Sequence, residues 1–162
     1  MTETDTDGDG DHRSNSYMMI PGCKSQKDPK VTVKTGSADC MVFVEVKMLN
    51  NCDDYITYSI ASGWNKLTKD AEGNSITGVY WREVPASPTD LDFFIFEGAD
   101  VEGMENGCIT VKESVTKEMA DKIEDNPDNM PQINFLAYAI QLSKDESQKF
   151  SPAEAWEHVS KI

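Results

Sequence analysis

Four aspartates at alternate positions near the start of the chain could hold a metal ion. In the segment DTDGDGD, Asp5, Asp7 and Asp9 occupy the first, third and fifth ligand positions of a calcium loop. Gly10 takes the sixth position, where a tight turn is needed, and Asp11 would offer its carbonyl at the seventh. Because calcium prefers hard oxygen ligands, these residues are the candidate calcium site, with affinity in the weak, millimolar range.

The same segment has a second interpretation, as an acidic solvated arm. The twelfth loop position is Ser16, whereas a complete calcium loop has a bidentate Glu there, and no helical pattern precedes the loop. Short motifs of this kind also arise by chance in acidic sequences, which favours the solvated arm. Calcium is therefore the one cofactor that the sequence suggests, and both interpretations remain open.

Catalytic constellations are not found in the sequence. The two histidines, His12 and His158, are far apart, and His158 stands near the end of an expected helix, where a cation is favoured. The sequence contains no HExxH, no GxSxG and no phosphate-binding glycine loop. We therefore expect a protein that is not an enzyme, with no catalytic residues.

Five of the aromatic residues have two interpretations. The residues concerned are Tyr55, Tyr58, Trp64, Tyr80 and Trp81. They could form a face on which a sugar stacks, but aromatic residues at strand positions more often pack in a core or across strands. We expect the second.

The four cysteines are separated by 17, 12 and 56 positions, and no CxxC pair occurs, which argues against a structural zinc site. Cys40 and Cys52 bracket one expected strand, whose ends would lie roughly 40 Å apart at about 3.3 Å per residue, too far for a disulfide. Two pairings remain: Cys23–Cys52 with Cys40–Cys108, or Cys23–Cys40 with Cys52–Cys108. Four reduced thiols are equally compatible with the sequence.

Charge excludes two classes of partner. The chain has 162 residues, with 15 Lys and Arg against 29 Asp and Glu, and a net charge of −14. Nucleic acids and anionic membranes attract the opposite sign, so neither is expected as a partner. No apolar run reaches the length of a membrane span, so membrane insertion is not expected. The N-terminal residues carry no signal segment, so the protein is either cytosolic or has lost a targeting segment.

The elements that must position these residues are mostly short strands. Alternating or apolar runs bounded by turn residues predict strands at 17–20, 31–34, 41–48, 55–60, 79–84, 91–96, 108–112 and 133–142. The last run is apolar on both faces, which is typical of a central strand. The run at 91–96, LDFFIF, should be central or covered by a partner strand, because it would aggregate on an exposed edge.

Two segments have helical signals. Met119 and Ile123 are four residues apart after Ser114 and Thr116, either of which could cap a helix, which predicts a helix at about 116–125. Ser-Pro-Ala-Glu at 151–154 reads as an N-cap, a first-turn proline and a capping box, which predicts a helix at about 152–160. Many strands with two short helices indicate a mainly β fold, a β-sandwich. We expect residues 1–15 to be an acidic Asp/Gly-rich arm and residues 16–162 to be a single domain.

The chain resembles the TasA/camelysin group, proteins of Gram-positive bacteria exported with the SipW signal peptidase. The resemblance rests on the order of short segments at 15–17 (NSY), 20–22 (IPG), 27–33 (KDPKVTV), 36–39 (GSAD), 42–46 (VFVEV), 60–64 (IASGW), 79–84 (VYWREV), 137–141 (AYAIQ) and 153–156 (AEAW). The resemblance implies a jelly-roll-type sandwich, secretion to the extracellular matrix or cell surface, and a role in biofilm fibres. The protease activity described for camelysin is not implied, because the chain lacks metal ligands for it.

In the TasA-like fibres of this group, an N-terminal strand from one subunit completes the sheet of the next, as in donor-strand complementation. The resemblance thus implies self-association into filaments by strand exchange, with other matrix proteins as further partners. The alternative is an extracellular calcium- or carbohydrate-binding module on the same sandwich.

Overall fold

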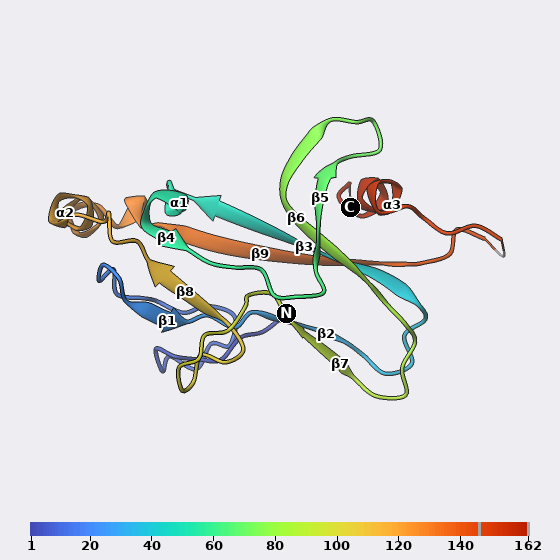
Figure 1. Ribbon diagram of the computed structural model, residues 1–162, viewed down its shortest axis with the longest axis horizontal. Coiled ribbons are helices and arrows are strands. Elements are labelled where there is room, and N and C mark those ends of the chain that lie inside the picture. Colours follow the sequence, from blue (N-terminus) through green and yellow to red (C-terminus); the bar gives the residue numbers. More distant parts are fainter. Residues whose placement is uncertain (146, 162) are drawn as a thin grey trace. The chain divides into compact units, whose positions relative to one another are not determined.

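The computed structural model describes residues 1–145 and 147–161, and the fold is mainly β, as predicted (Figure 1). The chain forms two compact units, each built from three segments. The first unit contains Met1–Lys30, Lys47–Ser62 and Phe94–Asn134. The second contains Val31–Val46, Gly63–Phe93 and Phe135–Ile162.

A four-stranded sheet is the main element of the second unit. Its strands are β5 (Asn65–Lys69), β6 (Ser75–Val84), β3 (Cys40–Leu49) and β9 (Gln132–Gln141), in that order across the sheet. Strands β3 and β6 are antiparallel, with Phe43 opposite Trp81. Residues Met41 to Val44 of β3 are all fully buried, so this strand is covered on both faces.

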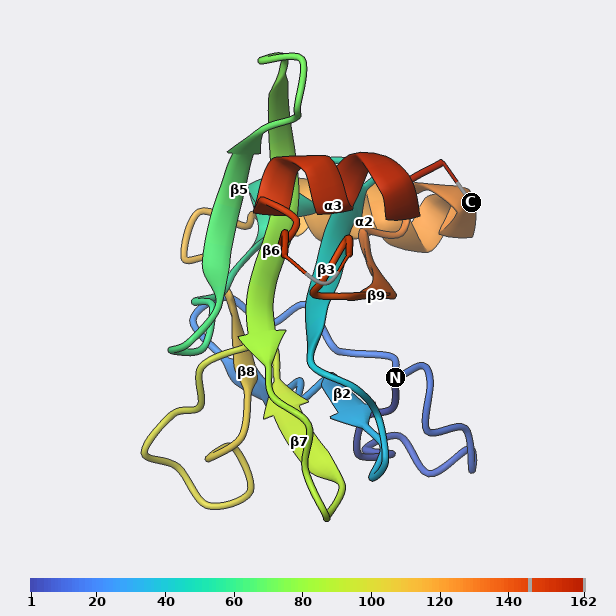
Figure 2. The same ribbon diagram turned by 90° about the vertical axis from the view of Figure 1, so that its right-hand side faces the viewer.

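Helix α3 (Pro152–Val159) packs on one face of this sheet (Figure 2). Trp156 lies 5.6 Å from Phe43, ring centroid to ring centroid, inside a cluster that also includes Met41, Leu67 and Val79. The predicted capping box is present: Ser151 accepts a hydrogen bond from the Glu154 amide, and the Glu154 carboxylate accepts one from the Ser151 amide. The predicted helix is therefore confirmed, and it contributes its apolar stripe to the core.

Strands β2 (Lys30–Val33) and β7 (Leu91–Phe94) form a two-stranded sheet. Thr32 donates a hydrogen bond of 2.6 Å to Asp92, and Lys34 one of 2.7 Å to Asp90. The run predicted at 91–96 thus has a partner strand, although the strand ends at Phe94.

The first unit contains a three-stranded sheet in the order β1 (Lys24–Gln26), β8 (Cys108–Val111), β4 (Ile56–Thr57). It also contains α1 (Cys52–Tyr55), α2 (Lys117–Asp125) and the 3₁₀ turn Pro127–Asn129. Helix α2 was predicted from its cap, and Thr116 accepts the expected hydrogen bond from the Met119 amide.

Several strand predictions need correction. Residues 17–20 form no strand, and the region predicted as a strand at 55–60 begins with the end of α1 and keeps only two strand residues. Strands β1 and β5 were not predicted, because KSQ and NKLTK have little apolar alternation. Strand β9 lies at the end of the sheet order and was wrongly predicted to be central; β6 and β3 are the two interior strands. Among the described residues, no helix combines the length and apolar character that a membrane span needs.

Candidate functional site

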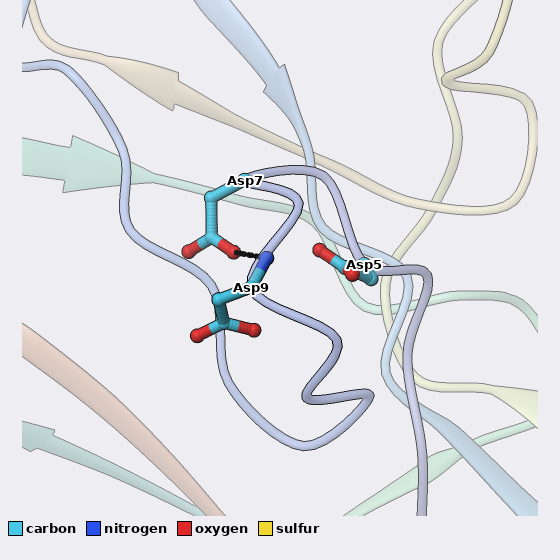
Figure 3. A group of neighbouring side chains, drawn as sticks. All are labelled: Asp5, Asp7 and Asp9. Atoms are coloured by element: carbon cyan, nitrogen blue, oxygen red, sulfur yellow. Dashed lines mark hydrogen bonds between the residues drawn. The ribbon is translucent and has the colours of Figure 1, made fainter.

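The acidic segment near the N-terminus folds into a loop that brings three of its carboxylates together (Figure 3). One ligand atom from each of Asp5, Asp7 and Asp9 lies within 4.8 Å of the others. Asp5 is half-buried, and Asp7 and Asp9 are exposed. The structure thus groups three of the four predicted calcium ligands; the Asp11 carboxylate is outside the group and accepts bonds from Arg13 and Ser14 instead.

The loop is shaped by hydrogen bonds from backbone amides to carboxylates. Asp5 accepts bonds from the amides of Gly8 (2.6 Å) and Gly10 (2.9 Å), and Asp7 accepts one from the Ser16 amide (2.7 Å). The bonds from Gly8 and Gly10 lower the pKa of Asp5, so this carboxylate stays ionised in mild acid. Such an arrangement holds negative oxygens close together, which is the condition for binding a hard cation.

The base of the loop is fixed by residues that the sequence analysis did not single out. Thr4 donates from its amide (2.8 Å) and its hydroxyl (2.6 Å) to the two carboxylate oxygens of Asp28. Glu3 and Lys27 form an ion pair whose side chains are only 4% and 8% exposed. Partners more than twenty positions apart leave no local sequence signal, so these anchors could not be predicted.

Tyr17 completes this base. The Lys27 ammonium lies 5.5 Å from the centroid of the Tyr17 ring, within the range of a cation–π contact. Burial is the main cause that raises the pKa of the Tyr17 hydroxyl, and the negative charge of Glu3 is the next largest. The acidic segment is therefore closed at its base by the buried ion pair of Glu3 and Lys27, while its tip is exposed.

The second feature that stands out is the outer edge of β9. Residues 129–143 contain no charged side chain and are the longest such run in a chain in which 27% of residues are charged. Among the described strands only β3 pairs with β9. Leu136 is 38% exposed, and Ala137 and Ala139 are exposed as well. An edge strand of ten residues with no charge and no internal proline lacks the usual protection against pairing with another chain.

The opposite edge of the same sheet is protected. Strand β5 has only five residues, carries Lys66 and Lys69, and its pairing with β6 shifts register between Leu67 and Lys69. Lysines and irregular pairing are the common devices that keep a sheet edge from recruiting another strand. The two edges therefore differ in the property that controls strand addition.

The aromatic residues considered for sugar stacking do not form one exposed row. Trp64 is 8% exposed, and Trp81 packs against the cluster under α3. The Arg82 guanidinium carbon lies 3.9 Å from the ring centroid of Phe93 and 5.4 Å from that of Trp64. This packing agrees with the interpretation of these rings as structural.

The four cysteines are free thiols, so neither predicted disulfide pairing is present. Cys23 is exposed, Cys108 half-buried, and Cys40 and Cys52 buried. His158 is exposed near the end of α3, as predicted, and its ring lies 5.1 Å from that of Phe150.

Comparison with family models, with characterised proteins and with solved structures finds nothing significantly similar to this chain.

Proposed function

We propose that this protein is a secreted, non-catalytic structural subunit that assembles by β-strand addition into fibres of the extracellular matrix or cell surface. The resemblance of its short segments to the TasA/camelysin group supports this proposal, and it also suggests a jelly-roll-type arrangement of the strands and a Gram-positive source. The mainly β fold is compatible with that arrangement.

The observation that carries the proposal is the unprotected edge of β9. Along such an edge, alternate amides and carbonyls point away from the sheet and can bind the backbone of an added strand. The uncharged side chains allow the approach, because no charge on β9 has to be desolvated when the strand is covered. In a chain with a net charge of −14, this neutral edge is where two copies repel each other least.

Electron microscopy and light scattering of the purified protein, over a range of protein and salt concentrations, test the proposal. We expect oligomers or fibres whose formation increases between about 20 and 300 mM NaCl, because salt screens the repulsion between acidic copies. Ala139→Lys, which places a charge on β9, should abolish assembly. Thr68→Lys on β5 is the matched control and should assemble like the wild type. A protein that stays monomeric under every condition would refute the proposal.

Calcium binding is a second candidate function, favoured by the grouping of Asp5, Asp7 and Asp9. Millimolar CaCl₂ should raise the melting temperature, and the double variant Asp5→Asn/Asp9→Asn should lose that response. Asp70→Asn is the control, because Asp70 shapes a different exposed loop by accepting amide bonds from Glu72 and Asn74. An equal response to MgCl₂, or a response that survives the double substitution, would exclude a calcium site in this loop.

A further inference from the structure

The proposed function leaves open which strand is added to β9. Resting on that proposal, we infer that the added strand is β9 of a second copy, in antiparallel orientation, around a two-fold axis at Leu136 or Ala137. The pair would join the two four-stranded sheets into one continuous sheet.

The first argument is charge. Most other edge strands of the described chain bring a charged residue to the contact: Lys24 in β1, Lys30 in β2, Lys66 and Lys69 in β5, and Asp92 in β7. The exception, β4, has only two residues. Only β9 against β9 pairs two long strands without placing a charge in either.

The second argument is the exposed apolar surface. With the axis at Leu136, this residue lies opposite Leu136 of the second copy. Ala137 then lies opposite Phe135 of the second copy, and Ala139 lies opposite Ile133. With the axis at Ala137, Leu136 lies beside Tyr138 and Ala139 beside Phe135. In either register, apolar or aromatic side chains of the second copy cover the exposed Leu136, Ala137 and Ala139. Burial of this apolar surface stabilises the pairing of the two strands.

The third argument is geometrical and limits the axis to two positions. A two-fold axis that pairs identical antiparallel strands is perpendicular to the sheet, so each face of one copy continues as the same face of the other. Directly opposed residues then come from the same face. Side chains alternate between the two faces with a period of two, so the numbers of two directly opposed residues must differ by an even number. One residue therefore faces its own copy, and the axis passes midway between these two copies. Leu136 and Ala137 are the two central residues of β9, and either choice pairs nine of its ten residues.

A two-fold pair uses the β9 edge of both copies and is closed. The pair is therefore the building unit, and growth into a fibre proceeds through another surface of that unit.

Disulfide cross-linking through cysteines introduced into β9 tests the inference; Cys40 and Cys52 are kept because both are buried. In a background with Cys23→Ser and Cys108→Ser, Leu136→Cys and Ala137→Cys are oxidised separately, and the covalent dimer is measured by non-reducing electrophoresis. We expect at least one of the two central variants to give a dimer at twice the 18.0 kDa of one chain. Gln132→Cys and Gln141→Cys are the controls: both sites are exposed, yet each lies roughly 27 to 34 Å from its own copy at about 3.4 Å per residue. They should give at least about tenfold less dimer, since a disulfide needs Cα atoms within about 7 Å.

Equal cross-linking at the ends and the centre would indicate parallel strands in register and would overturn the inference. Assembly of the wild type together with no cross-linking at either central site would also overturn it, because a different segment would then occupy the edge. That second result would leave the proposed function standing. Absence of assembly in the wild type, by contrast, would refute both.

Discussion

The Lys27 ammonium lies 2.7 Å from Oε2 and 2.9 Å from Oε1 of Glu3, although the two residues are 24 positions apart. Both side chains are almost fully buried. A buried charge that loses its partner is strongly destabilising, because its desolvation is no longer offset by attraction.

Glu3→Gln and Lys27→Met should therefore each lower the free energy of unfolding by about 3 kcal/mol or more, measured by urea denaturation. Lys34→Met is the control: Lys34 lies 2.7 Å from Asp90, but its side chain is 75% exposed, so the effect should be much smaller. Equal effects at the two pairs would show that burial does not distinguish them.

The start of helix α3 should make stability depend on pH. A hydrogen bond from Lys144 at 2.5 Å, and then bonds from Ser151, lower the pKa of Glu154 from 4.5 to about 2. A carboxylate with a lowered pKa contributes stability that is complete above its unfolded pKa and is lost as the pH falls toward its folded pKa.

We therefore expect the urea midpoint of the wild type to fall more steeply between pH 4.5 and 2 than that of Glu154→Gln. Lys144→Met should also reduce the slope, because it removes the largest cause of the shift. A slope that is unchanged in Glu154→Gln would contradict this assignment.

The thiols should differ in reactivity. Burial, and after it the negative charge of Asp53, raises the pKa of the Cys52 thiol to about 11. Burial also raises the pKa of the Cys40 thiol. Thiolate is the reactive form, so iodoacetamide at pH 8 should modify the exposed Cys23 first and Cys52 only after denaturation. Mass spectrometry of labelled peptides measures the order, and Cys23→Ser should remove the fast phase. Similar rates for Cys23 and Cys52 would be inconsistent with this packing.

Gly78 of β6 should tolerate no side chain. Its φ is 75°, and a Cβ there would lie 2.5 Å from the Val46 carbonyl oxygen. Gly73 also has a positive φ, 89°, but a Cβ would meet nothing within 4 Å. Gly73→Ala should lower the free energy of unfolding by about 1 kcal/mol, because alanine is strained at a positive φ. Gly78→Ala should lower it by at least twice as much, because the contact with Val46 is added to this strain. Thermal and urea unfolding of both variants measure the difference, and similar costs would show that the Val46 contact relaxes freely.

The positions of α2 and α3 were determined by the sequence itself, whereas α1 was not predicted. Ser151 and Glu154 satisfy each other's amides three residues apart, and Thr116 caps α2 in the same local manner. These hydrogen bonds close within one turn, so the residues that form them are adjacent in the sequence and can be recognised there. The grouping of Asp5, Asp7 and Asp9 is local in the same sense, and it was one of the two interpretations that the sequence left open.

The order of the strands was decided only by the tertiary structure. The run that forms β9 is apolar on two faces, whereas the run that forms β3 contains Glu45 and Lys47. Yet Met41 to Val44 of β3 are buried on both sides, and β9 lies at the end of the sheet order. The ion pair of Glu3 with Lys27 likewise depends on segments that meet only in the folded chain. Side-chain pattern determines which residues can be covered; which strand receives a second neighbour depends on backbone pairing between distant segments, and no local pattern encodes that pairing.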